Sequence, residues 1–175
     1  LKNRNIRRAR LIATEACRAA ENGEAFLERV RGETGLDLEI INRETEARLA
    51  AFGMHLGTAF QLIDDVLDYS ADEADTGKHL GDDLAEGKPT LPLIHVMQHG
   101  TPEQAALVRG AIEHGGRDDF AAVLAAIQDS GALAETLRYA QEEAKRAIEA
   151  ISVLPPSNFK DALLQLSDFA VRRKH

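Results

Sequence analysis

Apolar residues recur at spacings of three and four along residues 45–69, and this period constrains the fold more than any other feature of the sequence. It places one continuous stripe on one side of an α-helix. The stripe consists of Leu49, Phe52, Leu56, Phe60, Ile63 and Leu67. Gly53 and Gly57 lie together on another part of this helix, where we expect a second helix to approach closely. The later segments share the period, so the sequence predicts an all-α, antiparallel helical bundle with helix 45–69 at its centre.

Helix start and stop signals divide the rest of the chain into helical hairpins with short loops. Thr90 is expected to cap a helix that has Pro92 in its first turn, and Thr101–Gln104 forms a capping box. Ser130 and Ser157 are expected to cap the last two helices. The side chains expected to face inward from those two helices are Leu133, Leu137, Ala140, Ala144, Ile148, Phe159, Leu163, Leu166 and Phe169.

Residues 1–44 have a less regular pattern, and we treat them as a helical segment apart from the main region, residues 45–175. A rough helical stripe is formed by Ile6, Leu11, Ile12 and Ala16. Residues 36–41 alternate as a short strand would, but we expect helix or turn there and find no convincing strand in the chain. The arginines near the start form either a patch for an anionic surface or substrate diphosphate, or a solvated helix face.

Four polar side chains gather at the carboxyl end of the central helix. They are Gln61, Asp64, Asp65 and Asp68. Their spacing of three or four places them on neighbouring positions opposite the apolar stripe. In a bare helix, like charges at i,i+4 cost ~0.2–0.5 kcal/mol, and carboxylates in the last turn oppose the helix dipole by ~0.3–1 kcal/mol. A bound cation would reverse the sign of both effects.

The oxygen ligands and two nearby lysines favour a magnesium and diphosphate site over residues 60–92. Mg²⁺ usually takes one or two protein carboxylates, keeps waters and fills its other positions with phosphate oxygens. Lys78 and Lys88 each follow a glycine, so both can swing toward the same anion. The alternative is a solvated acidic helix end, which a bare DDxxD pattern would favour. The longer pattern FQLIDDVLDY, TGK, GDD and GKPTLP is far more specific than that core.

This longer pattern, within Gly57 to Pro92, resembles the second aspartate-rich region of trans-polyprenyl diphosphate synthases. The stretch GKPTLPLIHVMQHGTPEQ resembles their long-chain, octaprenyl-type bacterial branch. The resemblance implies an isoprenoid synthase-like helical fold, a homodimer and Mg²⁺ as cofactor. It also implies head-to-tail condensation of isopentenyl diphosphate with an allylic diphosphate, which yields a long-chain polyprenyl diphosphate, such as octaprenyl diphosphate, for quinone side chains.

The same resemblance implies a role for each candidate residue. The catalytic metal ligands would be Asp64, Asp65 and Asp68; Lys78 would be catalytic and would bind the substrate diphosphate together with Gln61 and Lys88. Family members also carry a Lys–Thr pair on the preceding helix and a first aspartate-rich motif, and neither is found here. The chain therefore looks like the C-terminal part of a longer enzyme, an incomplete domain that we expect to bind without appreciable turnover. Two alternatives stay open: a non-catalytic partner subunit or degenerate paralogue, and a structural helical domain with an acidic loop.

Composition narrows the possible partners and compartment. The net charge of −8 argues against nonspecific nucleic-acid binding. Cys17 is the only cysteine, so no intrachain disulfide forms and a reducing cytoplasm is expected. No apolar run approaches the ~20 residues that a transmembrane helix needs, and the start lacks the apolar core of a secretory signal. The hydrophobic product implied by the resemblance would nevertheless bring the enzyme near membranes.

Overall fold

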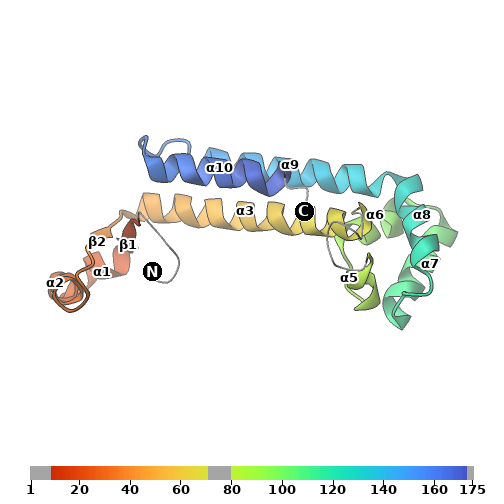
Figure 1. Cartoon of the computed structure of the whole chain (residues 1–175), viewed down its shortest axis with the longest axis horizontal. Helices are drawn as coiled ribbons and strands as arrows, with labels where there is room; N and C mark the ends of the chain where they lie inside the picture. Colours follow the sequence, from red (N-terminus) through yellow and green to blue (C-terminus); the bar gives the residue numbers. More distant parts are fainter. Residues whose placement is uncertain (1–8, 71–79, 173–175) are drawn as a thin grey trace.

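The computed structural model describes residues 9–70 and 80–172, and its helices are arranged along and around one long helix, α3 (Figure 1). Two helices lie along α3, four gather at its carboxyl end, and a small unit lies at its amino end. The helices of the main region are α3 (Arg43–Ser70), α5 (Asp82–Ala85), α6 (Leu91–His99), α7 (Pro102–His114), α8 (Phe120–Ser130), α9 (Ala132–Ala150) and α10 (Asn158–Arg172). The predicted helical bundle and its central helix are confirmed.

α3 and α9 run antiparallel and make the most extensive contact between helices in the described chain. Two contacts show the direction: Arg48 reaches the carbonyl of Ala150, and His55 reaches Glu143 farther along. The side chains that α9 buries are small, namely Ala132, Thr136, Ala140, Ala144 and Ala147. Small side chains let helix axes approach closely. The α3–α9 pair therefore forms the long axis on which the other helices pack.

The apolar core has two parts, one at each end of the α3–α9 contact. Near the start of α3, Phe52 packs with Ala147 and Ile151, and leucines of α3 and α10 surround them. At the carboxyl end of α3, a larger cluster combines residues of α3 and α5–α9: Tyr69, Leu84, Leu93, Val96, Val108, Ala111, Val123, Ala126, Ile127 and Ala132. This second cluster is the base on which the acidic end of α3 rests.

Three of the four residues predicted to cap helices directly precede a helix, and two of these three cap it with their side chains. Thr101 and Gln104 form a complete capping box before α7, and Ser157 Oγ accepts the Lys160 N–H at the start of α10. Thr90 stands at the N-cap of α6, although its side chain makes no capping bond. The prediction for Ser130 is wrong: Gly131 precedes α9, and Ser130 Oγ donates to the Ile127 carbonyl of its own helix.

Residues 9–42 correct the prediction that the chain contains no strand. β1 (Leu11–Ala13) and β2 (Leu38–Ile40) pair in parallel, and α1 (Glu15–Ala19) and α2 (Gly23–Thr34) connect them. Parallel strands need a crossover of a dozen or more residues, and these helices supply it. The alternation within residues 36–41 thus has a period of two, because one side of the sheet is covered while Ile12 and Glu39 on the other are exposed.

Several packing predictions are also wrong. A Cβ atom added at Gly53 or Gly57 would meet nothing within 4 Å, so no helix in the described chain approaches there. Four side chains expected to face inward are exposed instead: Ile148, Phe159, Leu166 and Phe169. Phe60 of the α3 stripe is also partly exposed. α10 packs through Leu163 and Leu164 because it lies on the α3–α9 pair from one side only.

Candidate functional site

The last two turns of α3 carry the predicted acidic residues, and the chain after residue 79 returns over this end of the helix. The Gly81 N–H donates to the carbonyl of Asp68 at 3.0 Å, just before α5 begins. Gly81 has φ of 76°, and a Cβ atom there would lie 2.3 Å from the ring of Phe120. Glycine is therefore required at this position for the return, which brings α5 and the start of α6 beside the aspartates.

Asp65 fastens the beginning of α6 to α3. Asp65 as a whole residue is only 6% exposed; Oδ1 accepts from Gln61 Nε2 at 3.0 Å and Oδ2 accepts from the Leu91 N–H at 3.2 Å. Leu91 is the first residue of α6, so Asp65 satisfies a backbone donor that has no partner within its own helix. Burial raises the pKa of Asp65, and the two hydrogen bonds oppose that shift. Gln61, predicted to bind the substrate diphosphate, is hydrogen-bonded to Asp65 in this structure.

Asp68 and Asp83 form a close pair of acidic residues. Asp68 Oδ2 accepts a hydrogen bond from the Asp83 N–H at 3.3 Å, so the second carboxylate is held next to the first. Burial, followed by repulsion from the Asp83 carboxylate, raises the pKa of Asp68 to about 6. A carboxyl group with such a pKa has an environment that disfavours its own negative charge. A bound cation would offset the repulsion between the two carboxylates and favour the ionised form of Asp68.

Lys88 lies on the same acidic cluster. Its Nζ is 2.6 Å from Glu86 Oε2 and 2.9 Å from Asp83 Oδ1, and hydrogen bonding to these two carboxylates raises the pKa of Lys88. The lysine side chain is 56% exposed, so it is free to turn toward a ligand. The other predicted lysine, Lys78, lies outside the described residues.

The cluster offers magnesium an oxygen donor set, although it is not a preformed cage. Asp64 is half-buried on the same end of α3, and its charge adds to that of Asp83 in raising the pKa of Asp65. Among the residues described, no group of three or more His, Cys, Asp or Glu converges tightly enough to hold a metal ion. Mg²⁺ commonly uses one or two protein carboxylates and completes its shell with water and phosphate. Asp64 and Asp68, both half-buried near the end of α3, would supply two such carboxylates.

Sequence reasoning missed the role of two groups at this site. Asp83 is half-buried beside Asp68, and the GDD within the longer pattern is the signal that the sequence offers for it. The Tyr69 hydroxyl, which belongs to no motif of the sequence, lies 3.3 Å from Thr90 Oγ1 in a buried contact. This contact explains why Thr90 does not cap α6. Tyr69 also stacks with Phe120 at a centroid distance of 6.3 Å, so these side chains pack beneath the acidic end of α3.

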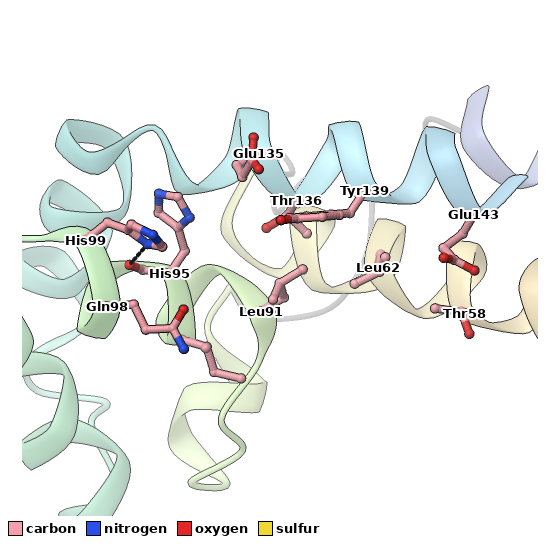
Figure 2. A pocket seen from close by; sticks show the side chains of 11 residues that line it. Thr58, Leu62, Leu91, His95, Gln98, His99, Glu135, Thr136, Tyr139 and Glu143 are labelled. Carbon is pink, nitrogen blue, oxygen red and sulfur yellow. Dashed lines mark hydrogen bonds between the residues drawn. The ribbon is translucent and has the colours of Figure 1, made fainter. Parts of the chain in front are cut away.

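A separate groove of about 330 Å³ lies between α3, α6 and α9 (Figure 2). His95 and His99 stack there with ring centroids 4.4 Å apart, and Glu135, Tyr139 and Glu143 face the same space from α9. None of the predicted site residues that the structure describes lines it. We therefore assign the candidate site to the acidic end of α3 and not to this groove.

In residues 9–70 and 80–172, no helix combines the length and the apolar character needed to cross a bilayer.

The class of protein is a helical bundle with a cluster of carboxylates at the end of its long helix α3. Comparison with known families identifies the family. The model of the family described as "Polyprenyl synthetase" matches residues 31–129. The chain belongs to the polyprenyl synthetase family. The match includes the acidic residues Asp64, Asp65, Asp68 and Asp83 and the lysine Lys88.

Relatives and solved structures agree with this assignment. The chain is 54% identical to octaprenyl diphosphate synthase from Escherichia coli (strain K12) over 131 residues, which cover 74% of this chain and 41% of the relative. The chain thus spans less than half the length of such relatives.

Two solved structures share the fold and contain ligands. A polyprenyl synthase from Caulobacter crescentus CB15, complexed with calcium and isoprenyl diphosphate, aligns with a TM-score of 0.69 and 37% identity over 77% of this chain and 42% of that one. A geranylgeranyl pyrophosphate synthase from Corynebacterium glutamicum, complexed with isoprenyl diphosphate and magnesium, aligns with a TM-score of 0.66 and 28% identity over 75% of this chain and 38% of that one.

Proposed function

We propose that this chain supplies one metal-binding wall of a prenyltransferase that condenses isopentenyl diphosphate with an allylic diphosphate. The product would be a long-chain polyprenyl diphosphate, such as octaprenyl diphosphate, for quinone side chains. The similarity to octaprenyl diphosphate synthase supports the product class, and the isoprenyl diphosphate in the Caulobacter crescentus structure supports the substrate class. We further propose that the complete enzyme is a homodimer in the cytoplasm.

The observation that carries the proposal is the Asp68–Asp83 pair. The two groups are held together by a backbone hydrogen bond although their charges repel, and the pKa of Asp68 is about 6 as a result of burial and that repulsion. An arrangement that is unfavourable in the free protein becomes favourable once a cation is bound. A merely structural acidic loop would have no reason to bury these carboxylates.

The residues of the site would divide the work as follows. Magnesium, when bound, would neutralise charge that develops on the diphosphate leaving group. Asp64 and Asp68 would hold it, and Asp65 would keep the start of α6 in position. Lys88 would turn from Asp83 toward the diphosphate, and Lys78 is proposed to join it. Such preorganised positive charge is what ionisation of an allylic diphosphate requires.

A thermal-shift titration tests the site. Mg²⁺ and pyrophosphate together should raise the unfolding midpoint more than either does alone, because each supplies ligands for the other. Asp64→Ala should abolish the joint shift, whereas Asp118→Ala, which changes an exposed aspartate that belongs to neither α3 nor α5, should leave it intact. If Mg²⁺ and pyrophosphate together do not change the unfolding midpoint, only a structural role would remain for the acidic cluster.

Activity is tested by incorporation of labelled isopentenyl diphosphate into butanol-extractable product. Ionisation of an allylic diphosphate requires positive charge on both sides of the leaving group, and one aspartate cluster would hold metal on one side only. We therefore expect this chain alone to bind ligands without appreciable turnover. In a full-length relative, replacing the aspartate that aligns with Asp64 by alanine should lower turnover by orders of magnitude. Mg²⁺-dependent incorporation by the 175-residue chain alone would contradict the expectation that this chain binds without turnover.

A further inference from the structure

Two histidines lie one turn apart at the carboxyl end of α6. His95 and His99 are the only two of the six histidines in the sequence that are four residues apart. Positions i and i+4 of a helix lie on the same face. The two imidazole rings are stacked, with centroids 4.4 Å apart and an angle of 28° between their planes. Because the rings already lie together, binding one ligand with both would cost little side-chain freedom.

The hydrogen bond made by His99 leaves one of its ring nitrogens available. His99 Nδ1 lies 3.2 Å from the carbonyl oxygen of His95. A carbonyl oxygen only accepts, so Nδ1 carries the proton, and the lone pair of the neutral ring is on Nε2. Histidines that bind a metal almost always donate their other ring N–H to a carboxylate, a backbone carbonyl or water. His99 thus already makes the outer hydrogen bond that is typical of a metal ligand.

The groove between α3, α6 and α9 gives this histidine pair room and a neighbouring negative charge (Figure 2). Its volume of about 330 Å³ is enough for a metal ion and several waters. The pKa of Glu135, which faces the groove from α9, is lowered mainly by its hydrogen bond to Arg138, and His95 adds to this shift. Glu135 and His95 are therefore electrostatic neighbours. Since Arg138 already holds the Glu135 carboxylate at 2.6 Å, Glu135 would act through its charge and not as a ligand.

We propose that His95 and His99 together bind a divalent transition metal of the zinc class, each through one imidazole nitrogen, with Nε2 as the ligand atom of His99. Imidazole suits zinc, copper and nickel, whereas Mg²⁺ takes oxygen ligands, so this site and the acidic end of α3 select different metals. Within residues 9–70 and 80–172, no three or more His, Cys, Asp or Glu side chains are arranged to hold a metal ion. The protein therefore supplies two ligands here, and water from the groove completes the shell.

A metal held by both rings would link the last two turns of α6. His99 is the final residue of this helix, and the last turn of a helix frays because its carbonyl groups lack partners within the helix. The Gly100 N–H donates to the Val96 carbonyl at 2.8 Å, directly after the histidine pair, and so reports on this turn. Binding should slow hydrogen exchange of the Gly100 amide.

Calorimetric titration with Zn²⁺ tests the site in the full chain. Cys17→Ser removes the one thiol, and excess Mg²⁺ competes for oxygen ligands. One Zn²⁺ should bind per chain, and His95→Ala or His99→Ala should each weaken binding by at least the roughly 10–100-fold that loss of an outer partner of a metal ligand costs. The control is His114→Ala, because His114 makes the same kind of bond to the Gly110 carbonyl, at 2.9 Å, but has no second histidine four residues away.

The result that would overturn the proposal is the absence of saturable Zn²⁺ binding, unchanged affinity in His95→Ala or His99→Ala, or an equal loss in His114→Ala. Circular dichroism verifies that these variants remain folded.

Nitrogen-15 NMR of the imidazole rings separates chelation by the pair from binding elsewhere. One equivalent of Zn²⁺ should shift the ring signals of His95 and His99 together and leave those of His114 unchanged. A shift of one ring alone, or of His114 to the same extent, would refute chelation by the pair. The joint Mg²⁺ and pyrophosphate shift of the unfolding midpoint should persist in His95→Ala and His99→Ala, so failure here is separable from failure of the proposed function.

Discussion

His55 Nδ1 and Glu143 Oε2 lie 2.6 Å apart and join α3 to α9 in the middle of their contact. Both side chains are largely shielded from solvent, with 25% and 15% of their surfaces exposed. The hydrogen bond to His55 is the main cause that lowers the pKa of Glu143, and Arg146 pairs with the same carboxyl group. This contact fixes the alignment of the two longest helices at a point where the buried side chains of α9 are small.

Glu143→Ala should therefore destabilise the fold more than removal of an exposed glutamate. We expect a loss of about 1–2 kcal/mol in the free energy of unfolding, because a hydrogen bond to a charged, half-buried group is lost. Urea unfolding monitored by circular dichroism measures it. Glu142→Ala is the matched control, since Glu142 pairs with Arg138 on the surface and its loss should cost under about 1 kcal/mol. Equal losses for the two variants would show that the His55 contact adds nothing.

Enlarging a small residue between α3 and α9 should also be costly. Ala144 is buried in this contact, and Ala144→Leu should destabilise by about 1–3 kcal/mol because the helices cannot separate without losing other contacts. Ala134→Leu, at an exposed position of the same helix, is the control and should be nearly neutral. Chemical denaturation of both variants decides the matter, and a neutral Ala144→Leu would mean that the contact is loosely packed.

Asp65 should be needed to position the start of α6. Asp65→Ala leaves the Leu91 N–H and the Gln61 amide without their acceptor, and we expect a loss of about 1–3 kcal/mol in stability. Asp65→Asn keeps one acceptor oxygen and should lose less. Amide hydrogen exchange at the first turn of α6 is the direct measurement. Unchanged protection there in Asp65→Ala would remove the positioning role, whatever happens to metal binding.

The raised pKa of Asp68 predicts an unusual pH dependence of stability in the metal-free protein. The folded state holds this proton more tightly, with a pKa of about 6, than the unfolded state, whose ordinary value is about 3.9. The stability contribution is therefore complete below about pH 4 and is lost as the pH rises through 6. Other carboxyl groups, such as Glu143, have lowered pKa values and act in the opposite direction. The difference between wild type and Asp68→Asn isolates the Asp68 contribution.

Thermal unfolding in the presence of a chelator should show the wild-type midpoint falling between pH 4 and pH 6.5 relative to that of Asp68→Asn. With Mg²⁺ and pyrophosphate present, the trend should reverse, because a metal ligand must be deprotonated. A constant difference between the two proteins over this range would show that Asp68 titrates normally.

The main-region helices could be predicted from the sequence because their signals are local. The period of residues 45–69, the Thr101–Gln104 box and the FQLIDDVLDY pattern each act over a few turns. The strand at Leu38–Ile40 could not be predicted in this way, because its pairing partner lies 27 residues earlier at Leu11. The same reason hid the Asp68–Asp83 contact, which depends on the return of the chain at Gly81. Exposure of Phe169 was missed because the period of a helix identifies an apolar face but not whether another element covers it.

One consequence of the unbroken course of α3 concerns insertions and deletions. Its first half packs on α9 and its last two turns carry the aspartates, so the two halves are linked by helical phase. One residue added or removed between Leu56 and Gln61 would turn the acidic end by about 100° against the packed end and direct Asp64 and Asp68 away from α5. Insertion of seven residues, close to two full turns, would restore the phase to within about 20° but lengthen the helix. The spacing between these two halves should therefore tolerate substitution far better than any change in length.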